Sequence, residues 1–242
     1  NTYRQLLNPG VKLMAMVKAF SYGSGSFEIA NLLQFNHVDY LAVAYADEGV
    51  ELRKGGITLP IMVMNAEEIT YDVLVQYNLE PELFSFGILS SFQDYLKLGG
   101  INNYPVHIKL DTGMRRLGFE PKDMEALCSR LQSTSVFKIQ SVFSYLFFSV
   151  SVVHYKFTNA QAKAFLAGSE QVQAITDYPF IRHIANTSAI HRHKDMQLDM
   201  VRLGIGLYGV DADPAIQQQL KNVTTLKTTI SQVKTIKAGE SI

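Results

Sequence analysis

The sequence predicts an α/β fold, a closed (β/α)8 barrel of the TIM type, on three observations. Eight short runs of apolar or β-branched residues recur along the chain, and helical patterns separate most of them. The runs are nearly continuous in apolar residues, as expected of strands buried on both faces. Such alternation favours parallel pairing with right-handed crossovers, and eight units suit a chain of 242 residues. The predicted strands lie within residues 12–19, 39–44, 60–65, 80–86, 105–111, 137–146, 179–186 and 200–209.

Six helices are predicted between these runs. Phe27 to Leu33 has apolar residues at helical spacing, and Ser26 is a candidate cap. Asp47 to Lys54 is followed by two glycines, which favour a helix end. The other helical patterns cover residues 66–76, 90–98, 121–131 and 158–175. An open doubly wound sheet is the alternative, but no Gly-x-Gly-x-x-Gly follows the first strand, which disfavours its dinucleotide-binding form.

The last part of the chain has a different character. Residues 223–236 alternate and are rich in threonine, which is typical of a strand with one exposed face. We therefore expect a barrel over residues 1–220 and the start of a truncated C-terminal β-domain over 221–242.

Composition narrows the function class. The chain has 22 basic and 22 acidic residues, 47% hydrophobic residues and no long apolar run, so neither nucleic acid nor a membrane is an expected partner. Its single cysteine, Cys128, excludes an internal disulfide and fits a helical packing position. Four histidines, at 107, 183, 191 and 193, have no spacing typical of a metal site, so no metal is expected.

Lys18 is the first candidate functional residue, because it ends an apolar run. A desolvated lysine has a lowered pKa and becomes a nucleophile toward carbonyl groups, although a lysine at a strand end also often extends to water. Barrel enzymes place their functional residues at the C-terminal ends of the strands. Further candidates at such ends are Lys109, Asp111, Arg116, Asn186, Thr187, Ser188, Arg202, Gly204 and Ile205. Hydroxyl groups after strand seven and glycine amides near strand eight match the usual phosphate site of such barrels.

Four segments resemble alanine racemases, in the order and spacing of that family and over nearly the whole chain. They are Val17-Lys18-Ala19-Phe20-Ser21-Tyr22-Gly23-Ser24-Gly25, the stretch from His107 to Phe119, the stretch from His183 to Ser188, and the stretch from Met200 to Gly209. The resemblance implies a fold-type III pyridoxal 5'-phosphate barrel followed by a β-domain, in a homodimer. It also implies a cytoplasmic isomerase that supplies D-alanine for peptidoglycan.

The resemblance assigns roles to individual residues. Lys18 would bind the cofactor covalently and act as one of two catalytic bases, and Arg116 would bind near the cofactor and the substrate carboxylate. Arg202 would face the pyridine nitrogen and keep it unprotonated, because a guanidinium only donates. Lys109 would carry a carbamate that orients Arg116. The remaining expected cofactor contacts are Tyr22, Tyr145, Asn186, Thr187, Ser188, Gly204 and Ile205.

Two departures from the family pattern affect the expected activity. Tyr145 stands where the family has a histidine against the cofactor ring, and the following segment to Val153 is more apolar than in the family. The second base, a tyrosine of the partner's β-domain, would follow a segment like residues 237–242. We therefore expect residues 1–242 alone to racemise alanine poorly.

Two other functions fit parts of the sequence. A single-barrel pyridoxal-phosphate-binding module without racemase activity would also contain Lys18 and the phosphate contacts. An aldolase that acts on a sugar phosphate would use a Schiff-base lysine but has no need of Arg202. The preference among small amino acids, such as alanine or serine, does not follow from the sequence.

Overall fold

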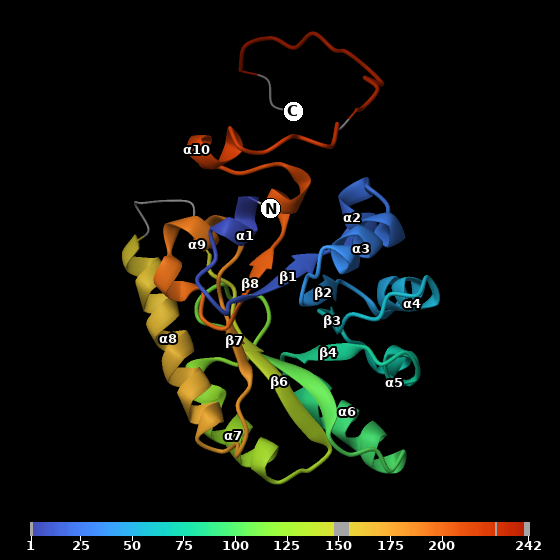
Figure 1. The fold of residues 1–242 in the computed structure, drawn as a ribbon, viewed down its shortest axis with the longest axis vertical. Helices are drawn as coiled ribbons and strands as arrows, with labels where there is room; N and C mark the ends of the chain where they lie inside the picture. The colour runs from blue at the N-terminus through green and yellow to red at the C-terminus, as the bar shows by residue number, and fades with distance from the viewer. Residues whose placement is uncertain (1, 148–154, 226, 240–242) are drawn as a thin grey trace.

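The computed structural model describes residues 2–147, 155–225 and 227–239 and confirms the predicted barrel. Eight parallel strands form one sheet in the order β7-β6-β5-β4-β3-β2-β1-β8 (Figure 1). The strands are β1 (Lys12–Met16), β2 (Tyr40–Val43), β3 (Ile61–Val63), β4 (Glu80–Leu83), β5 (Tyr104–Lys109), β6 (Phe137–Phe143), β7 (Ile181–His183) and β8 (Met200–Leu203). Seven of them lie within their predicted runs, β5 begins one residue before its run, and each strand is shorter than the run that predicted it.

The barrel closes between β7 and β8. No ladder pairs these two strands among the described residues, but backbone hydrogen bonds cross the gap next to them. Asp199 N donates to Arg182 O at 3.2 Å, and Arg202 N donates to Ala185 O at 2.9 Å. The sheet therefore continues around the barrel, and the C-terminal ends of β1 and β8 meet at the same mouth.

The helices are α1 (Thr2–Gln5), α2 (Lys18–Gly23), α3 (Ser26–Phe35), α4 (Ala46–Lys54), α5 (Tyr71–Gln76), α6 (Phe86–Leu98), α7 (Met124–Gln132), α8 (Tyr155–Gln173), α9 (Thr187–Arg192) and α10 (Pro214–Gln217). Helices α3 to α8 surround the sheet, and α10 lies beyond one end of the barrel (Figure 1). Short 3-10 turns are η1 (Glu68–Thr70), η2 (Pro121–Asp123), η4 (Lys194–Met196) and η5 (Ile205–Tyr208). All six predicted helices are present, with shifted ends.

One predicted cap is wrong. Ser26 lies inside α3, and the residue at the cap position is Gly25, with φ 94° and no side-chain hydrogen bond. The positive φ favours glycine there, which explains why the serine begins the helix one residue later.

Two hydrophobic clusters divide the core. The larger cluster lies between the strands and the surrounding helices. Along the strands, residues of the smaller cluster alternate with residues of the larger one and therefore point to the opposite face of the sheet. The smaller cluster fills the barrel interior and contains Met14, Met16, Tyr40, Ala42, Met62, Phe143 and Met200. Buried polar side chains of β4 to β8 occupy the other part of the interior.

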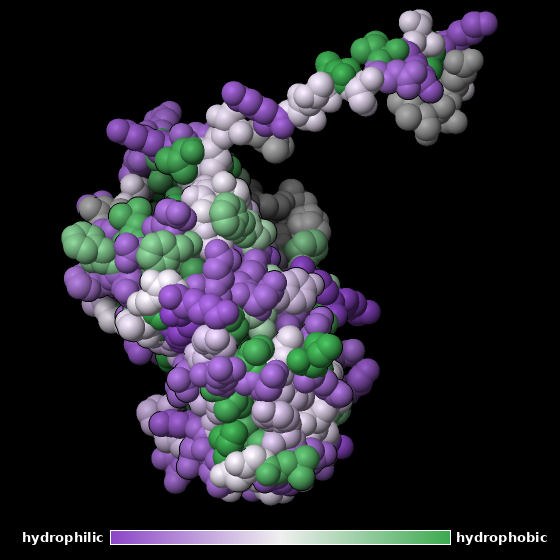
Figure 2. All heavy atoms as spheres, turned by 90° about the vertical axis from the view of Figure 1, so that its right-hand side faces the viewer, coloured by the Kyte–Doolittle hydropathy of each residue, from purple (hydrophilic) through white to green (hydrophobic). Residues whose placement is uncertain are grey.

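The C-terminal segment is not the strand that its alternating pattern predicts. The described residues from 222 onward form no strand, and Val223, Ile230, Val233 and Ile236 are exposed. A strand is stable only beside a pairing neighbour, and no described residue pairs with this segment. Figure 2 shows it projecting from the barrel, with apolar side chains facing outward.

Candidate active site

A hollow of about 280 Å³ lies at the barrel mouth, where the strands end. All ten residues expected to bind the cofactor or to act as catalytic residues line it. They are Lys18, Tyr22, Arg116, Tyr145, Asn186, Thr187, Ser188, Arg202, Gly204 and Ile205. Met16, Met64 and Met114, which sequence reasoning missed, complete its wall. The fold thus gathers residues that are far apart in the sequence, from Lys18 to Ile205, around one small space.

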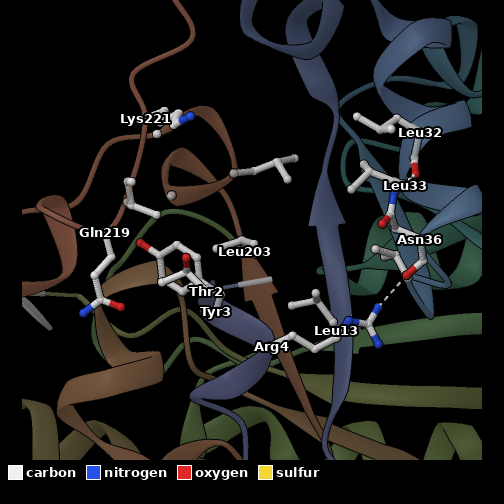
Figure 3. Close-up of a pocket in the computed structure, with 15 residues that line it drawn as sticks. Thr2, Tyr3, Arg4, Leu13, Leu32, Leu33, Asn36, Leu203, Gln219 and Lys221 are labelled. Carbon is white, nitrogen blue, oxygen red and sulfur yellow. Dashed lines mark hydrogen bonds between the residues drawn. The ribbon is translucent and has the colours of Figure 1, made fainter.

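A second hollow, of about 350 Å³, lies on the other side of the barrel wall (Figure 3). Leucines of β1, α3 and β8 form much of its surface, and Arg4 donates to the backbone oxygen of Asn36 at 3.0 Å across it. It lies outside the barrel, against α1 and α3, and holds none of the residues predicted from the motifs. The candidate site is therefore the hollow at the barrel mouth.

The segment that carries Lys18 and Tyr22 has an unusual backbone. Ala19, Phe20, Ser21 and Tyr22 all have φ between 49° and 53°, so α2 contains a left-handed turn made of four residues other than glycine. Such residues cost about 1–2 kcal/mol each in this conformation. This turn places the side chains of Lys18 and Tyr22 beside the same hollow, whereas a right-handed turn would direct these side chains differently.

Contacts with the rest of the barrel hold this strained turn. The backbone N–H of Ala19 donates to Glu48 Oε1 at 2.6 Å, and Ser21 is fully buried. The Tyr22 ring packs against Tyr208 with 4.7 Å between centroids, and Tyr208 Oη donates to Met16 O at 3.0 Å. Strained backbone persists where surrounding structure over-determines it, and this occurs mostly at functional sites.

Polar atoms converge on Gly204. A Cβ built there would lie 3.7 Å from Thr187 Oγ1 and 3.9 Å from Tyr22 Oη. The Gly204 N–H donates to Thr187 Oγ1 at 3.0 Å. Two hydroxyl groups and a backbone amide thus surround one point, which is a suitable arrangement for a phosphate group.

Asn186 supports this wall of the hollow. Its Oδ1 caps α9 by accepting from Ala189 N at 3.2 Å, and its Nδ2 donates to Leu146 O at 3.0 Å. These bonds connect the end of β7 to the segment after β6. Asn186 therefore holds the position of Thr187, the next residue.

Arg202 is buried under the hollow. Nη1 donates to His183 Nδ1 at 2.8 Å and to His183 O at 3.2 Å, and Nη2 donates to Ser144 O at 2.6 Å and to Ile184 O at 3.2 Å. Its Nε–H has no hydrogen-bond partner among the described residues. Burial lowers the pKa of Arg202 to about 10, so the guanidinium stays charged at neutral pH.

Lys109 lies below the hollow and contacts a residue that sequence reasoning missed. Its Nζ donates to Glu82 Oε1 at 2.9 Å, with both side chains buried, and it lies 5.4 Å from the centre of the Phe143 ring. Arg116, which a modified Lys109 was expected to orient, is exposed and makes no hydrogen bond with the described residues. The unmodified Lys109 is therefore paired with Glu82, and its expected carbamate stays a prediction.

The pKa of Glu82 reflects this environment. Burial raises the pKa of its carboxyl above the ordinary value of 4.5, and the Lys109 ammonium opposes that rise. Glu82 Oε2 has no partner among the described residues. The sequence does contain a signal for a polar barrel interior, because Glu80 and Glu82 occupy alternate positions of an otherwise apolar strand and so point to the same face.

Tyr145 lines the hollow as expected. Gln161 of α8 holds its segment, donating to Tyr145 O at 3.2 Å and accepting from Phe147 N at 3.0 Å. The more apolar part of the segment, from residue 148 to Val153, lies outside the described residues.

The histidines and Cys128 have other surroundings. Among the described residues no three His, Cys, Asp or Glu side chains gather as metal ligands. His107 and His183 are buried inside the barrel, and His191 lies 3.3 Å from Asp211. Cys128 is half-buried on α7, and burial raises the pKa of its thiol. No helix in the described part of the chain has the length and apolar character to cross a bilayer.

Comparison with known proteins identifies relatives along nearly the whole chain. The chain is 34% identical to the alanine racemase of Synechocystis sp. over 247 aligned residues, which cover 99% of the chain and 65% of that protein. It is 34% identical to the alanine racemase of Clostridium tetani, with 96% of the chain and 61% of that protein covered. The chain thus spans less than two thirds of these curated relatives.

Solved structures give the same answer for the fold. The alanine racemase of Clostridium difficile 630 superposes with a TM-score of 0.83 and 30% identity, over 91% of this chain and 58% of that one. The alanine racemase of Bartonella henselae with covalently bound pyridoxal phosphate gives a TM-score of 0.77 and 27% identity, over 87% and 60%. The model of the alanine racemase N-terminal domain matches residues 1–212, and the chain therefore belongs to the alanine racemase N-terminal domain family.

Proposed function

We propose that the protein containing this chain interconverts L- and D-alanine with pyridoxal 5'-phosphate bound at the barrel mouth. The observation that carries the proposal is the shared hollow, where Lys18, Arg116 and Arg202 meet hydroxyl groups and a glycine amide. Its volume of about 280 Å³ is near the ~300 Å³ lower end of ligand pockets, which suits a compact cofactor and a small amino acid.

The residues present fit this cofactor. A side chain at position 204 would enter the space between Thr187 and Tyr22, so the glycine leaves room for a phosphate there. Arg202 offers an uncommitted Nε–H to a ring nitrogen, and Tyr145 offers an aromatic face. Lys18 supplies the amine that binds an aldehyde.

Each residue has a defined task in this proposal. The bound cofactor supplies an electron sink that acidifies the α-hydrogen of the amino acid. Arg202 would donate a hydrogen bond to the ring nitrogen and, as a cation, would disfavour its protonation, which would limit that sink and disfavour side reactions. Arg116 holds the substrate carboxylate through its planar fork. Lys18 Nζ removes or returns the α-proton on one face.

Racemisation also requires a base on the opposite face. As the family resemblance implies, we propose that a tyrosine of a partner subunit supplies it in a homodimer, and that residues 221–242 begin the β-domain that builds this contact. Carbamylation of Lys109 stays a prediction from the family resemblance, and the unmodified Lys109 Nζ lies 2.9 Å from Glu82 Oε1. A D-alanine supply for peptidoglycan would place the enzyme in the cytoplasm.

Borohydride reduction with pyridoxal phosphate, followed by peptide mapping, tests the site in the full-length protein. We expect the reduced adduct on Lys18 in the wild type and in Lys12→Arg, whose lysine lies at the other end of β1, and its loss in Lys18→Arg. Chiral analysis of alanine should show racemisation that falls by at least ~10²-fold in Lys18→Arg. An adduct distributed over surface lysines, or racemisation that survives the loss of Lys18, would contradict the proposal.

A further inference from the structure

A continuous line of hydrogen bonds crosses five neighbouring strands inside the barrel. Arg202 Nη1 lies 2.8 Å from His183 Nδ1, and His183 Nε2 lies 2.9 Å from Ser141 Oγ. Ser141 Oγ lies 2.7 Å from His107 Nδ1, and His107 Nε2 lies 2.9 Å from Glu80 Oε2. The line thus runs from β8 under the hollow through β7, β6 and β5 to β4.

The chemistry of its two ends fixes the direction of every bond. A guanidinium only donates, so His183 Nδ1 must accept from Arg202 and His183 must carry its proton on Nε2. Ser141 Oγ then accepts from His183 Nε2–H. The Ser141 hydroxyl proton has one acceptor left among the described residues, His107 Nδ1, so His107 donates from Nε2 to the Glu80 carboxylate.

The geometry points to a one-way relay in which Glu80 is a positioning residue for Arg202, holding His107 and His183 as neutral, Nε2-protonated tautomers. The inference rests on the proposed function only where it connects Arg202 to catalysis. A doubly protonated His107 would leave the buried Ser141 hydroxyl without an acceptor among the described residues, and an Nδ1-protonated His183 would turn a second donor toward Arg202.

Glu80 is well placed as the anionic end. Tyr40 Oη donates to the same Oε2 at 2.8 Å, so this oxygen receives two hydrogen bonds, and the Glu80 side chain is only 12% exposed. Burial and the negative charge of Glu80 both raise the pKa of Tyr40, which keeps the phenol protonated as a donor. The relay therefore joins a buried cation to a partly buried carboxylate through neutral groups.

Nitrogen NMR of the full-length protein, labelled with ¹⁵N-histidine, tests the tautomers at pH 7 without any cofactor. We expect His183 and His107 to be neutral with the proton on Nε2, in the wild type and in Glu80→Gln, whose amide oxygen still accepts. Glu80→Leu should shift the His107 Nε2 signal, because that N–H loses its acceptor while Nδ1 still accepts from Ser141, and Glu125→Leu, which removes an exposed carboxylate, should change nothing. If Glu80→Leu does not fold, Ser141→Ala cuts the relay at its centre and should shift both histidines.

Kinetics then test the connection to Arg202. Glu80→Leu should lower kcat for alanine by about tenfold, as loss of an outer-shell partner does, with KM within about twofold, and Glu80→Gln should restore kcat. An Nδ1-protonated or doubly protonated His183 in the wild type would overturn the relay, as would histidine signals unchanged in both relay-cutting variants. Expected tautomers in a protein that does not racemise alanine would overturn the proposed function and leave the relay standing.

Discussion

The buried pair of Lys109 and Glu82 gives the most quantitative prediction. Replacing Lys109 by methionine keeps most of the side-chain volume and removes the only ammonium that contacts Glu82 among the described residues. We expect Lys109→Met to lower the free energy of unfolding by about 3–5 kcal/mol at pH 7, because breaking a buried ion pair leaves one uncompensated charge.

The magnitude follows from the geometry. Two unit charges 2.9 Å apart attract by about 6 kcal/mol at an effective dielectric constant of about 20. Part of this is recovered in the variant, since Glu82 can take up a proton. Burial already raises its pKa, and the variant lacks the ammonium that opposes the rise. A raised carboxyl pKa means that the folded state binds more protons than the unfolded one, so the variant should lose further stability as the pH rises from 5 to 8.

Urea unfolding followed by circular dichroism measures both effects. Lys122→Met is the matched control, because Lys122 pairs with Glu120 at 3.2 Å while both side chains are more than half exposed. Exposed pairs contribute below about 1 kcal/mol, and the control should show no added pH dependence. A double variant, Lys109→Met with Glu82→Leu, should recover much of the loss. Equal costs for the two single lysine variants would refute the reasoning.

Two further predictions concern the fold. Gly118 has φ 128°, and a Cβ there would lie 2.6 Å from Asp111 N, so Gly118→Ala should cost at least about 2 kcal/mol in urea unfolding. Gly10→Ala, at φ 81° with no atom within 4 Å of the added Cβ, should cost only about 1 kcal/mol, and the reverse order would be contrary to this account. Burial and Arg202 lower the pKa of His183 below 6.5, so the unfolded chain binds more protons there and stability should fall below pH 6.5. The titration of His183 should change the free energy of unfolding by at most about 1.4 kcal/mol per pH unit, and His183→Gln should lack this contribution. An equal pH dependence of unfolding in both proteins would contradict the lowered pKa of His183.

The barrel and the residues at its mouth could be predicted from the sequence because both depend on local patterns. Continuous apolar runs predicted all eight strands, and the rule that functional residues follow parallel strands brought Lys18, Arg116 and Arg202 to one mouth. The predicted ends of the strands were less accurate than their positions. Residues such as Val17 continue the apolar pattern but already belong to the turn after the strand.

The barrel interior was not predicted, because the identity of a partner across strands is a tertiary property. Glu80 and Glu82 are close in sequence, but only the closure of the sheet shows that one faces His107 and the other Lys109. Likewise, the pattern of residues 19–22 carries no signal for a left-handed turn, since none of them is glycine. The surrounding contacts override the local preference there.

The two unexpected features of this barrel have a common physical basis. Buried charged side chains in the barrel interior and left-handed backbone at its mouth are both unfavourable in isolation. In each case, contacts with residues of several other elements offset the cost. Arg202 is fixed by four hydrogen bonds, and the turn after Lys18 is fixed by Glu48 and Tyr208. Rigid placement of a cation under the hollow and of an amine at its edge is what an enzyme needs when proton transfer requires fixed geometry. The free energy that the core could have gained from apolar residues is instead used to hold the site.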